Sequence, residues 1–205
     1  MNLHRAETEA ERKEAFRRRS ERYLQLGHDR FAAATLVAQS AGPLIGPALD
    51  VGTGKGLLAM ALARLNMEVV SVDVDDDEQA LAALLAEEAG VRGRIQFVRA
   101  DAVRLPFSGK VFGCAAMMAV LHHLVDPIPV LDEMARVVRP GGVIIMAEFS
   151  EAGFELVARV HRETGHEHPR SSATLDMALA LIEHGGFRCV ERTERQHYRV
   201  AVLRK

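Results

Sequence analysis

Short apolar runs alternate with longer amphipathic segments along this chain, starting near residue 48 and continuing, with one interruption, to the C-terminus. Strands that are buried on both faces of a parallel sheet lack regular polar alternation, and these apolar runs lack it too. The amphipathic segments between them therefore predict helices that cover both faces of a sheet. The strand candidates span residues 48–51, 68–72, 95–99, 111–118, 143–149, 187–192 and 198–203.

This order of runs predicts an α/β fold of the doubly wound, Rossmann-like type, with a seven-stranded sheet and helices on both faces. The rhythm loosens through residues 150–172, where we expect an irregular segment. Only residues 193–197 separate the last two runs, which predicts a hairpin. The sheet should therefore be mostly parallel, with an antiparallel last strand. Helices between the strands are expected at residues 56–65, 76–89, 127–138 and 173–184.

Two more helices are expected before the first strand, at residues 4–24 and 29–40. The first of these is rich in Arg and Glu and lacks Gly and Pro, which is typical of a solvated helix. The full length of 205 residues fits one globular domain. We expect residues 1–45 to form helices that cap the functional site and residues 46–205 to form the main domain.

Charge and cysteine content narrow the function classes. A net charge of −2 gives no excess positive field for a polyanion, which argues against sequence-independent nucleic-acid binding and favours a small-molecule partner. Cys114 and Cys189 show no spacing typical of zinc or of a redox dithiol. No apolar run approaches the ~20 residues that span a bilayer, and the charged N-terminus lacks a signal core, so we expect a cytoplasmic protein without a membrane span.

A glycine-rich segment, Asp50-Val51-Gly52-Thr53-Gly54-Lys55-Gly56, joins the first strand to the first helix. In open α/β sheets, ligands bind beyond the carboxyl ends of the strands, where the strand order reverses. Glycines allow both a tight turn and the close approach of a ligand to the backbone. A phosphate-binding P-loop needs Ser or Thr after its lysine, and Gly56 stands there instead. The G-x-G-x-G spacing also differs from the dinucleotide pattern G-x-G-x-x-G, which weakens a nicotinamide-dependent oxidoreductase without removing it as an alternative.

The segment ALDVGTGKG resembles the first motif of the class I S-adenosylmethionine-dependent methyltransferases, acid-x-G-x-G-x-G after the first strand. The resemblance implies that S-adenosylmethionine is the cofactor and that the loop holds it. Asp73 ends the second strand, 23 positions after Asp50, where the family has an acid that accepts hydrogen bonds from both ribose hydroxyls. A carboxylate fixed at a strand end can accept hydrogen bonds from both hydroxyls of a vicinal diol. The loop residues expected to bind the cofactor are Asp50, Gly52, Thr53, Gly54 and Gly56.

The resemblance continues downstream and implies further cofactor contacts. Asp101 and Ala102 follow the third strand, where the family binds the adenine, and Val74 would pack on the adenine face. Met117 lies in the region similar to the family's fourth motif, and we expect it near the methionine end of the cofactor. Gly113 and the pair Met117-Met118 depart from the family pattern there. Residues 131–142 resemble the family's fifth region, and the match is closest to small-molecule methyltransferases related to quinone-biosynthesis enzymes.

The implied reaction is an in-line transfer of the methyl group to a small-molecule acceptor. Positioning accounts for much of such catalysis, and an acidic hydroxyl or thiol acceptor also needs a base. Histidine suits that role at neutral pH, so the expected catalytic residues are His122, His166 and His168, with His123 and Glu148 as further candidates. The segment 161–170 should line the acceptor pocket, because it follows the fifth strand. Its three histidines match no zinc signature, so no metal is expected.

Alternatives stay open at this point. The same motifs fit an RNA methyltransferase or a regulatory protein that binds S-adenosylmethionine without catalysis. A homodimer is also compatible with the sequence.

Overall fold

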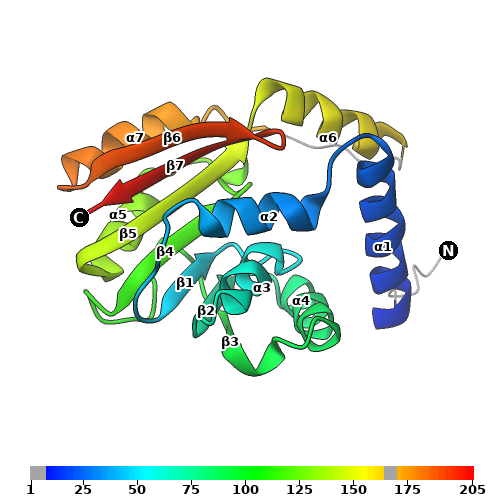
Figure 1. The fold of residues 1–205 in the computed structure, drawn as a ribbon, viewed down its shortest axis with the longest axis horizontal. Helices are drawn as coiled ribbons and strands as arrows, with labels where there is room; N and C mark the ends of the chain where they lie inside the picture. Colours follow the sequence, from blue (N-terminus) through cyan, green and yellow to red (C-terminus); the bar gives the residue numbers. More distant parts are fainter. Residues whose placement is uncertain (1–7, 164–169) are drawn as a thin grey trace, which may run out of the picture.

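The computed structural model describes residues 8–163 and 170–205, which form a seven-stranded sheet with helices on both faces (Figure 1). The strands are β1 (Ala48–Val51), β2 (Val69–Asp73), β3 (Ile95–Arg99), β4 (Phe112–Met118), β5 (Val138–Phe149), β6 (Arg188–Arg195) and β7 (Tyr198–Arg204). The helices are α1 (Glu9–Gln25), α2 (Arg30–Gln39), α3 (Leu57–Arg64), α4 (Asp76–Glu88), α5 (Ile128–Val137), α6 (Glu151–Glu163) and α7 (Leu175–His184), with short 3₁₀ turns η1 (Arg92–Arg94) and η2 (Leu121–His123).

The strand order is β3-β2-β1-β4-β5-β7-β6, and β1 to β5 run parallel. β7 runs antiparallel to both of its neighbours, β5 and β6. The predicted doubly wound sheet with an antiparallel last strand is therefore confirmed. The strand order reverses between β1 and β4, so the loops that follow these two strands open side by side at the carboxyl edge of the sheet.

Alternate residues of each buried strand face the two helical layers. On β4, Cys114 and Ala116 pack on the side of α2, α3 and α4, whereas Ala115 and Met117 pack on the side of α5 and α7. Figure 1 shows α2 crossing one face of the sheet, with α5 and α7 on the other. The apolar runs had no polar alternation because both faces of these strands are covered.

Helix α1 stands beside the carboxyl edge and contacts α2, α4 and α6 (Figure 1). A capping box between Thr8 and Glu11 starts the helix. Ion pairs then tie α1 to its neighbours at both ends. Arg12 lies 2.9 Å from Asp77, next to the first residue of α4, and Arg22 lies 2.6 Å from Glu163 of α6.

Two segments differ from the expectation. Residues 151–163 form the regular helix α6, so the irregular segment expected from residue 150 was wrong for this stretch. Its apolar residues Phe154, Val157 and Val160 recur at a spacing of three, but polar residues and Gly153 obscure the pattern. The hairpin between β6 and β7 is tighter than expected, because Gln196 and His197 alone form the turn, both with positive φ.

Within residues 8–163 and 170–205, no helix is both long and apolar enough to cross a membrane.

Val37 and Ala38 of α2 belong to the same core cluster as Leu62 of α3. The N-terminal helices thus share the core of the main domain, and the division at residue 45 stays a prediction.

Gly113 of β4 lies too close to the backbone of Ile45 to tolerate a side chain. A Cβ at this position would lie 1.7 Å from the carbonyl oxygen of Ile45, which is backbone and cannot rotate away. We expect Gly113→Ala to lower the free energy of unfolding by about 3 kcal/mol in urea titrations. Gly93→Ala is the matched control, since no atom lies within 4 Å of its Cβ position. Equal stability of the two variants would contradict the tight approach of Ile45 to β4.

Candidate functional site

The glycine loop after β1 adopts a conformation that only glycine accepts easily. Gly52, Gly54 and Gly56 have φ of 81°, 47° and 71°. A Cβ on Gly52 would lie 2.5 Å from Val120, and one on Gly56 would lie 2.9 Å from Ala82, whereas nothing lies within 4 Å of the Cβ position on Gly54. The first and last glycines therefore permit close packing, and the middle one faces open space where a ligand can approach.

A buried hydrogen-bond network supports this loop from below. Ser71 Oγ donates to Asp50 Oδ2 at 2.7 Å, and Ser71 Oγ and Thr53 Oγ1 share another hydrogen bond of 2.7 Å. Gln79 of α4 donates to Thr53 Oγ1 at 3.3 Å and to the Val98 carbonyl at 3.0 Å. The network thus joins β1, β2, β3 and α4 beneath the loop.

Asp50 and Thr53 were expected to bind the cofactor, but their side chains face this network. Asp50 is 1% exposed and Thr53 is 4% exposed. Burial raises the pKa of Asp50 to about 7, which the hydrogen bond from Ser71 opposes and the nearby charge of Asp73 adds to. Both side chains therefore support the loop from beneath, and they lie below the surface that a ligand would touch.

Asp73 occupies the end of β2 beside the loop. Its Oδ2 accepts a hydrogen bond from the Gly54 N–H at 2.9 Å, and its Oδ1 accepts one from the Asp75 N–H at 3.1 Å. An ionised carboxylate offers about four lone-pair positions, so it can accept two more hydrogen bonds. Val74, the next residue, is 59% exposed.

Asp101 and Ala102 follow the neighbouring strand β3. The Ala100 N–H donates to the Asp73 carbonyl at 2.9 Å, which holds the loop after β3 against the end of β2. Asp101 is exposed and accepts a hydrogen bond from the Val103 N–H at 3.0 Å. The structure thus brings together Gly54, Asp73, Val74, Asp101 and Ala102 at one edge, as the sequence predicts.

Met117 was expected near the methionine end of the cofactor, and that contact stays a prediction. Its side chain is fully buried in the core between the sheet and helices α5 and α7. Because side chains alternate along a strand, the side chain of Met118 points to the opposite face of the sheet. Met118, Ala119 and Val120 are half-buried at the end of β4, and Val120 packs against Gly52. They are the residues of this segment that border the loop.

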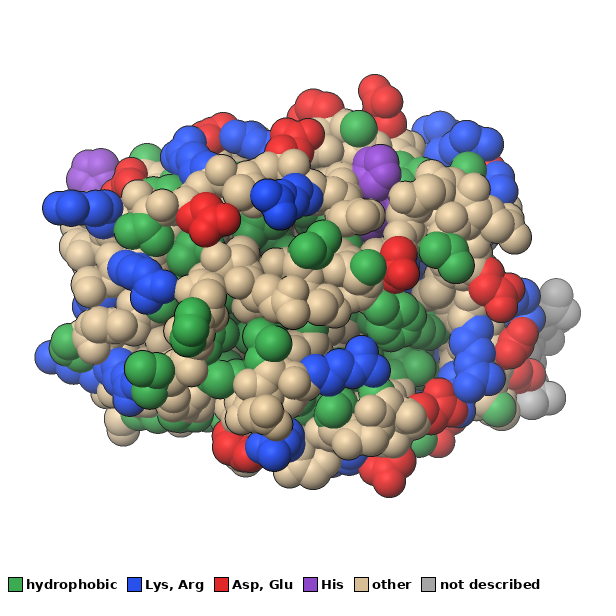
Figure 2. Space-filling view, viewed as in Figure 1, with side chains coloured by type: hydrophobic (Ala, Val, Ile, Leu, Met, Phe, Trp, Pro, Cys, Tyr) green, Lys and Arg blue, Asp and Glu red, His purple; other side chains and the backbone are tan. Residues whose placement is uncertain are grey.

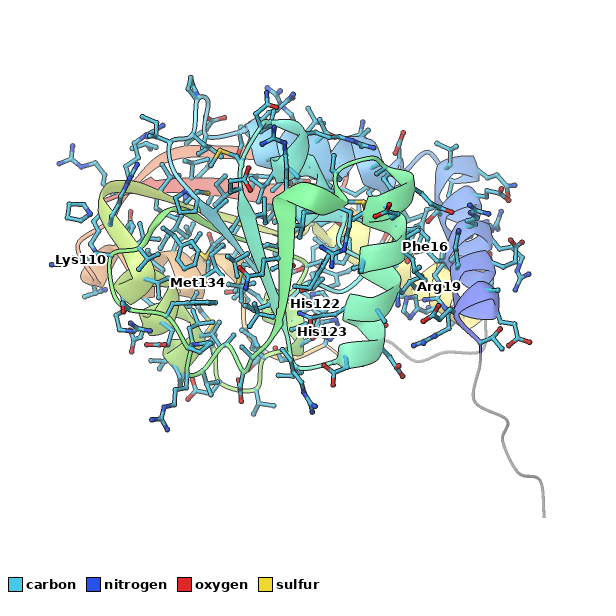
Figure 3. All side chains as sticks on the ribbon, turned by 90° about the horizontal axis from the view of Figure 1, so that it is seen from below. Phe16, Arg19, Lys110, His122, His123 and Met134 are labelled. Carbon is cyan, nitrogen blue, oxygen red and sulfur yellow. The ribbon has the colours of Figure 1, made fainter. Side chains whose placement is uncertain are left out.

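His122 lies in the turn after β4 and pairs with Glu148 near the end of β5. Its Nδ1 lies 2.8 Å from Glu148 Oε1, and its backbone N–H donates to Glu148 Oε2 at 3.1 Å. The His122 ring is 1% exposed and lies near the rings of Phe149 and Phe154. His123 is exposed, with its ring centroid 4.0 Å from that of His122. Figure 3 shows both histidines near the middle of the view.

The other two predicted catalytic residues, His166 and His168, lie outside the described residues. Just after them, the Ser171 N–H donates to the His122 carbonyl at 2.8 Å, so the described end of this segment lies next to His122. In the part of the chain that the structure describes, no three His, Cys, Asp or Glu residues are grouped so that they could hold a metal.

Ser71 and Gln79 are functional supports that the sequence reasoning missed. Each is a polar residue in an otherwise apolar position, Ser71 inside the strand Val69–Asp73 and Gln79 on the buried side of α4. That contrast was the available signal, because buried polar side chains are normally hydrogen-bonded.

Comparisons with known proteins agree with this geometry. A family described as "Methyltransferase domain" matches residues 49–146. The demethylmenaquinone methyltransferase of Clavibacter sepedonicus is 35% identical over 146 residues, which cover 69% of this chain and 56% of that protein. The ubiquinone/menaquinone biosynthesis C-methyltransferase UbiE of Pseudomonas putida is 33% identical over 116 residues, 55% of this chain and 45% of that protein. The chain thus spans about half the length of these curated relatives.

Solved structures share the fold. The glycopeptide N-methyltransferase MtfA in complex with (S)-adenosyl-L-methionine gives a TM-score of 0.67 at 18% identity, over 86% of this chain and 94% of that one. The [4+2]-cyclase SpnF gives a TM-score of 0.68 at 21% identity, over 85% of this chain and 80% of that one. A cyclase among these neighbours illustrates that the shared fold does not fix the reaction.

The buried Asp50 should make the stability of the folded chain depend on pH. Its pKa is about 7 in the folded chain, whereas an unfolded Asp titrates near 3.9. Between these values the folded state keeps a proton that the unfolded state has lost, so the Asp50 contribution to stability falls as the pH rises from about 4 to about 7. Asp50→Asn removes this titration. In urea titrations, the variant should therefore gain stability relative to the wild type as the pH rises from about 4 to about 7. A constant difference between the two proteins would show that Asp50 is charged throughout.

Proposed function

Since the chain belongs to the class I S-adenosylmethionine-dependent methyltransferases through its domain at residues 49–146, we propose that it methylates a small organic acceptor. The observation that carries the proposal is the open backbone at Gly54 beside the carboxylate of Asp73, which has room for two more hydrogen bonds. A ligand with a vicinal diol next to a flat ring fits this edge. The names of the two curated relatives concern quinone synthesis, which supports a small-molecule acceptor.

The residues at this edge suit S-adenosylmethionine. Gly52 and Gly54 would let it approach the backbone, Asp73 would accept hydrogen bonds from its ribose, and Val74, Asp101 and Ala102 would surround its adenine. When bound, S-adenosylmethionine supplies the methyl group of its sulfonium, and the rest of the cofactor leaves as a neutral thioether. The protein then has to bring the acceptor into line and exclude water.

The pair of His122 and Glu148 could remove a proton from the acceptor. A carboxylate beside Nδ1 favours the tautomer with the proton on Nδ1, which makes Nε2 the basic nitrogen. Glu148 also stabilises the imidazolium that forms when His122 takes a proton. The ring is buried against Phe149 and Phe154, so contact with an acceptor requires those side chains to shift. We propose His122 as the base and Glu148 as its positioning residue.

Charge on the surface favours a small molecule over RNA as the acceptor. On the face drawn in Figure 2, acidic and basic side chains are interspersed, whereas phosphate-backbone binding relies on clustered Lys and Arg. Release of S-adenosylhomocysteine in the presence of a metabolite panel would support the enzymatic proposal. Cofactor binding without turnover on any acceptor would instead identify a regulatory protein.

Asp73→Ala should weaken the binding of S-adenosylhomocysteine about 10- to 150-fold in isothermal titration, because a hydrogen bond to a charged group contributes about 1.5 to 3 kcal/mol. The exposed Asp132 of α5 provides the control variant Asp132→Ala, which should bind like the wild type. The wild type should bind neither NADH nor ATP at comparable concentration. Unchanged affinity in a folded Asp73→Ala variant, or tight NADH binding, would overturn the assignment of this edge.

Glu148→Gln should lower kcat about 10- to 100-fold on an acceptor that must lose a proton, because the amide cannot stabilise the His122 imidazolium. His122→Asn should lower kcat at least as much, and both variants should change the pH profile of kcat. The control is His184→Asn, since His184 is exposed at the end of α7. If kcat and its pH profile stay as in the wild type, His122 and Glu148 have only a structural role.

A further inference from the structure

Two arginines between α1 and β7 lack a carboxylate partner. Within residues 8–163 and 170–205, Arg19 of α1 makes no hydrogen bond or ion pair, and its Nε is buried without a partner. Arg30, the first residue of α2, donates one hydrogen bond, from Nη1 to Ser20 Oγ at 3.3 Å. Its guanidinium also lies over the rings of Phe16 and Tyr23, 5.1 and 5.2 Å from their centroids.

Other arginines of α1 are neutralised. Each has a carboxylate within 4.0 Å, in the pairs Arg12–Asp77, Arg17–Glu88, Arg18–Glu14 and Arg22–Glu163. Arg19 thus differs from the other arginines of α1 in having no carboxylate partner, and Arg30 of α2 shares this feature. Glu78, which attracts the charge of Arg30, already pairs with Lys55.

Leaving the Arg30 charge without a carboxylate is costly. Burial lowers the pKa of the Arg30 guanidinium, and the nearby charge of Arg19 lowers it further. An arginine taken out of water is normally paired, because desolvation of the charge is otherwise uncompensated. A buried N–H without a partner likewise calls for a missing ligand or ion. Arg19, with an unpartnered Nε, and Arg30, with one hydrogen bond, both keep guanidinium N–H groups that could donate to an anion.

The surroundings connect this anion site to His122. Burial raises the pKa of Tyr198 of β7, and the nearby charge of Arg30 opposes that shift. The Tyr198 ring stacks on Phe149 with ring centroids 4.7 Å apart. Phe149 in turn lies 5.6 Å from the His122 ring. Figure 3 shows Phe16 and Arg19 on the side of α1 that faces the domain. By contrast, Asp73 ends β2, on the other side of β1 from this cluster.

We propose that Arg19 and Arg30 bind the oxyanion of an acidic methyl acceptor, a carboxylate or a phosphate. This inference rests on the proposed function, because it assigns the substrate class of the same site. The planar guanidinium fork matches either oxyanion with two parallel hydrogen bonds. The same guanidinium groups could bind the carboxylate of the cofactor instead, and the test separates these two sources.

The experiment measures two ligands independently on the full chain. Isothermal titration of S-adenosylhomocysteine reports the cofactor site. Titration of benzoate and phenyl phosphate into the protein, with and without S-adenosylhomocysteine, reports the anion site, and neutral benzamide is the ligand control. The variants are Arg19→Gln, Arg30→Gln and Arg30→Lys, with Arg18→Gln as the matched control because Arg18 is solvent-exposed on the same helix. Thermal unfolding verifies that each variant is folded.

We expect benzoate or phenyl phosphate to bind the wild type more tightly than benzamide, and to bind Arg19→Gln at least tenfold more weakly. Arg18→Gln should bind like the wild type, Arg30→Lys should retain more affinity than Arg30→Gln, and the affinity for S-adenosylhomocysteine should stay within threefold throughout. The inference is overturned if neither anion binds more tightly than benzamide. It is also overturned if Arg19→Gln weakens S-adenosylhomocysteine tenfold but leaves 5′-methylthioadenosine, which lacks the carboxylate, unchanged. Failure of the wild type to bind S-adenosylhomocysteine would instead refute the proposed function.

Discussion

The buried hydrogen bonds that join Ser71 to Asp50 and Thr53, with Ser71 donating to Asp50, are the interactions on which the site depends. A turn made of three glycines with positive φ has high conformational entropy when unfolded, so it needs firm attachment when folded. The network provides it by fixing the loop to β1 and β2, while Gln79 extends it to β3. Because every side chain involved is buried, the network lies below the loop, and the open side of Gly54 remains available above it.

The sheet topology places the candidate site residues on either side of this loop. The ends of β2 and β3 carry Asp73 and Asp101 on one side, and the ends of β4 and β5 carry His122 and Glu148 on the other. Helix α1 lies beside this edge, where its buried Phe16 and Tyr23 pack into apolar clusters and ion pairs with α4 and α6 add to the attachment. Exposed ion pairs each contribute about 0 to 1 kcal/mol, so apolar packing accounts for most of the attachment of α1.

The sequence predicted the sheet, its antiparallel last strand and the glycine loop, because periodicity and glycine spacing are local properties. It did not predict that Met117 faces the core, since one residue along a strand reverses the side chain and the register depends on neighbouring strands. Helix α6 was missed because its apolar face is short and polar residues interrupt it. Arg19 and Arg30 look like ordinary surface charges in the sequence. Only the packing of α1 and α2 reveals that these two lack the carboxylates that their neighbours have.

A crystal structure of the chain with S-adenosylhomocysteine would locate the cofactor directly relative to the loop. We expect both ribose hydroxyls on the Asp73 carboxylate, the adenine beside Val74 and Asp101, and the sulfur near the end of β4. Asp50 should stay buried against Ser71. Density for the ligand elsewhere, or a ribose that does not touch Asp73, would contradict this position of the cofactor.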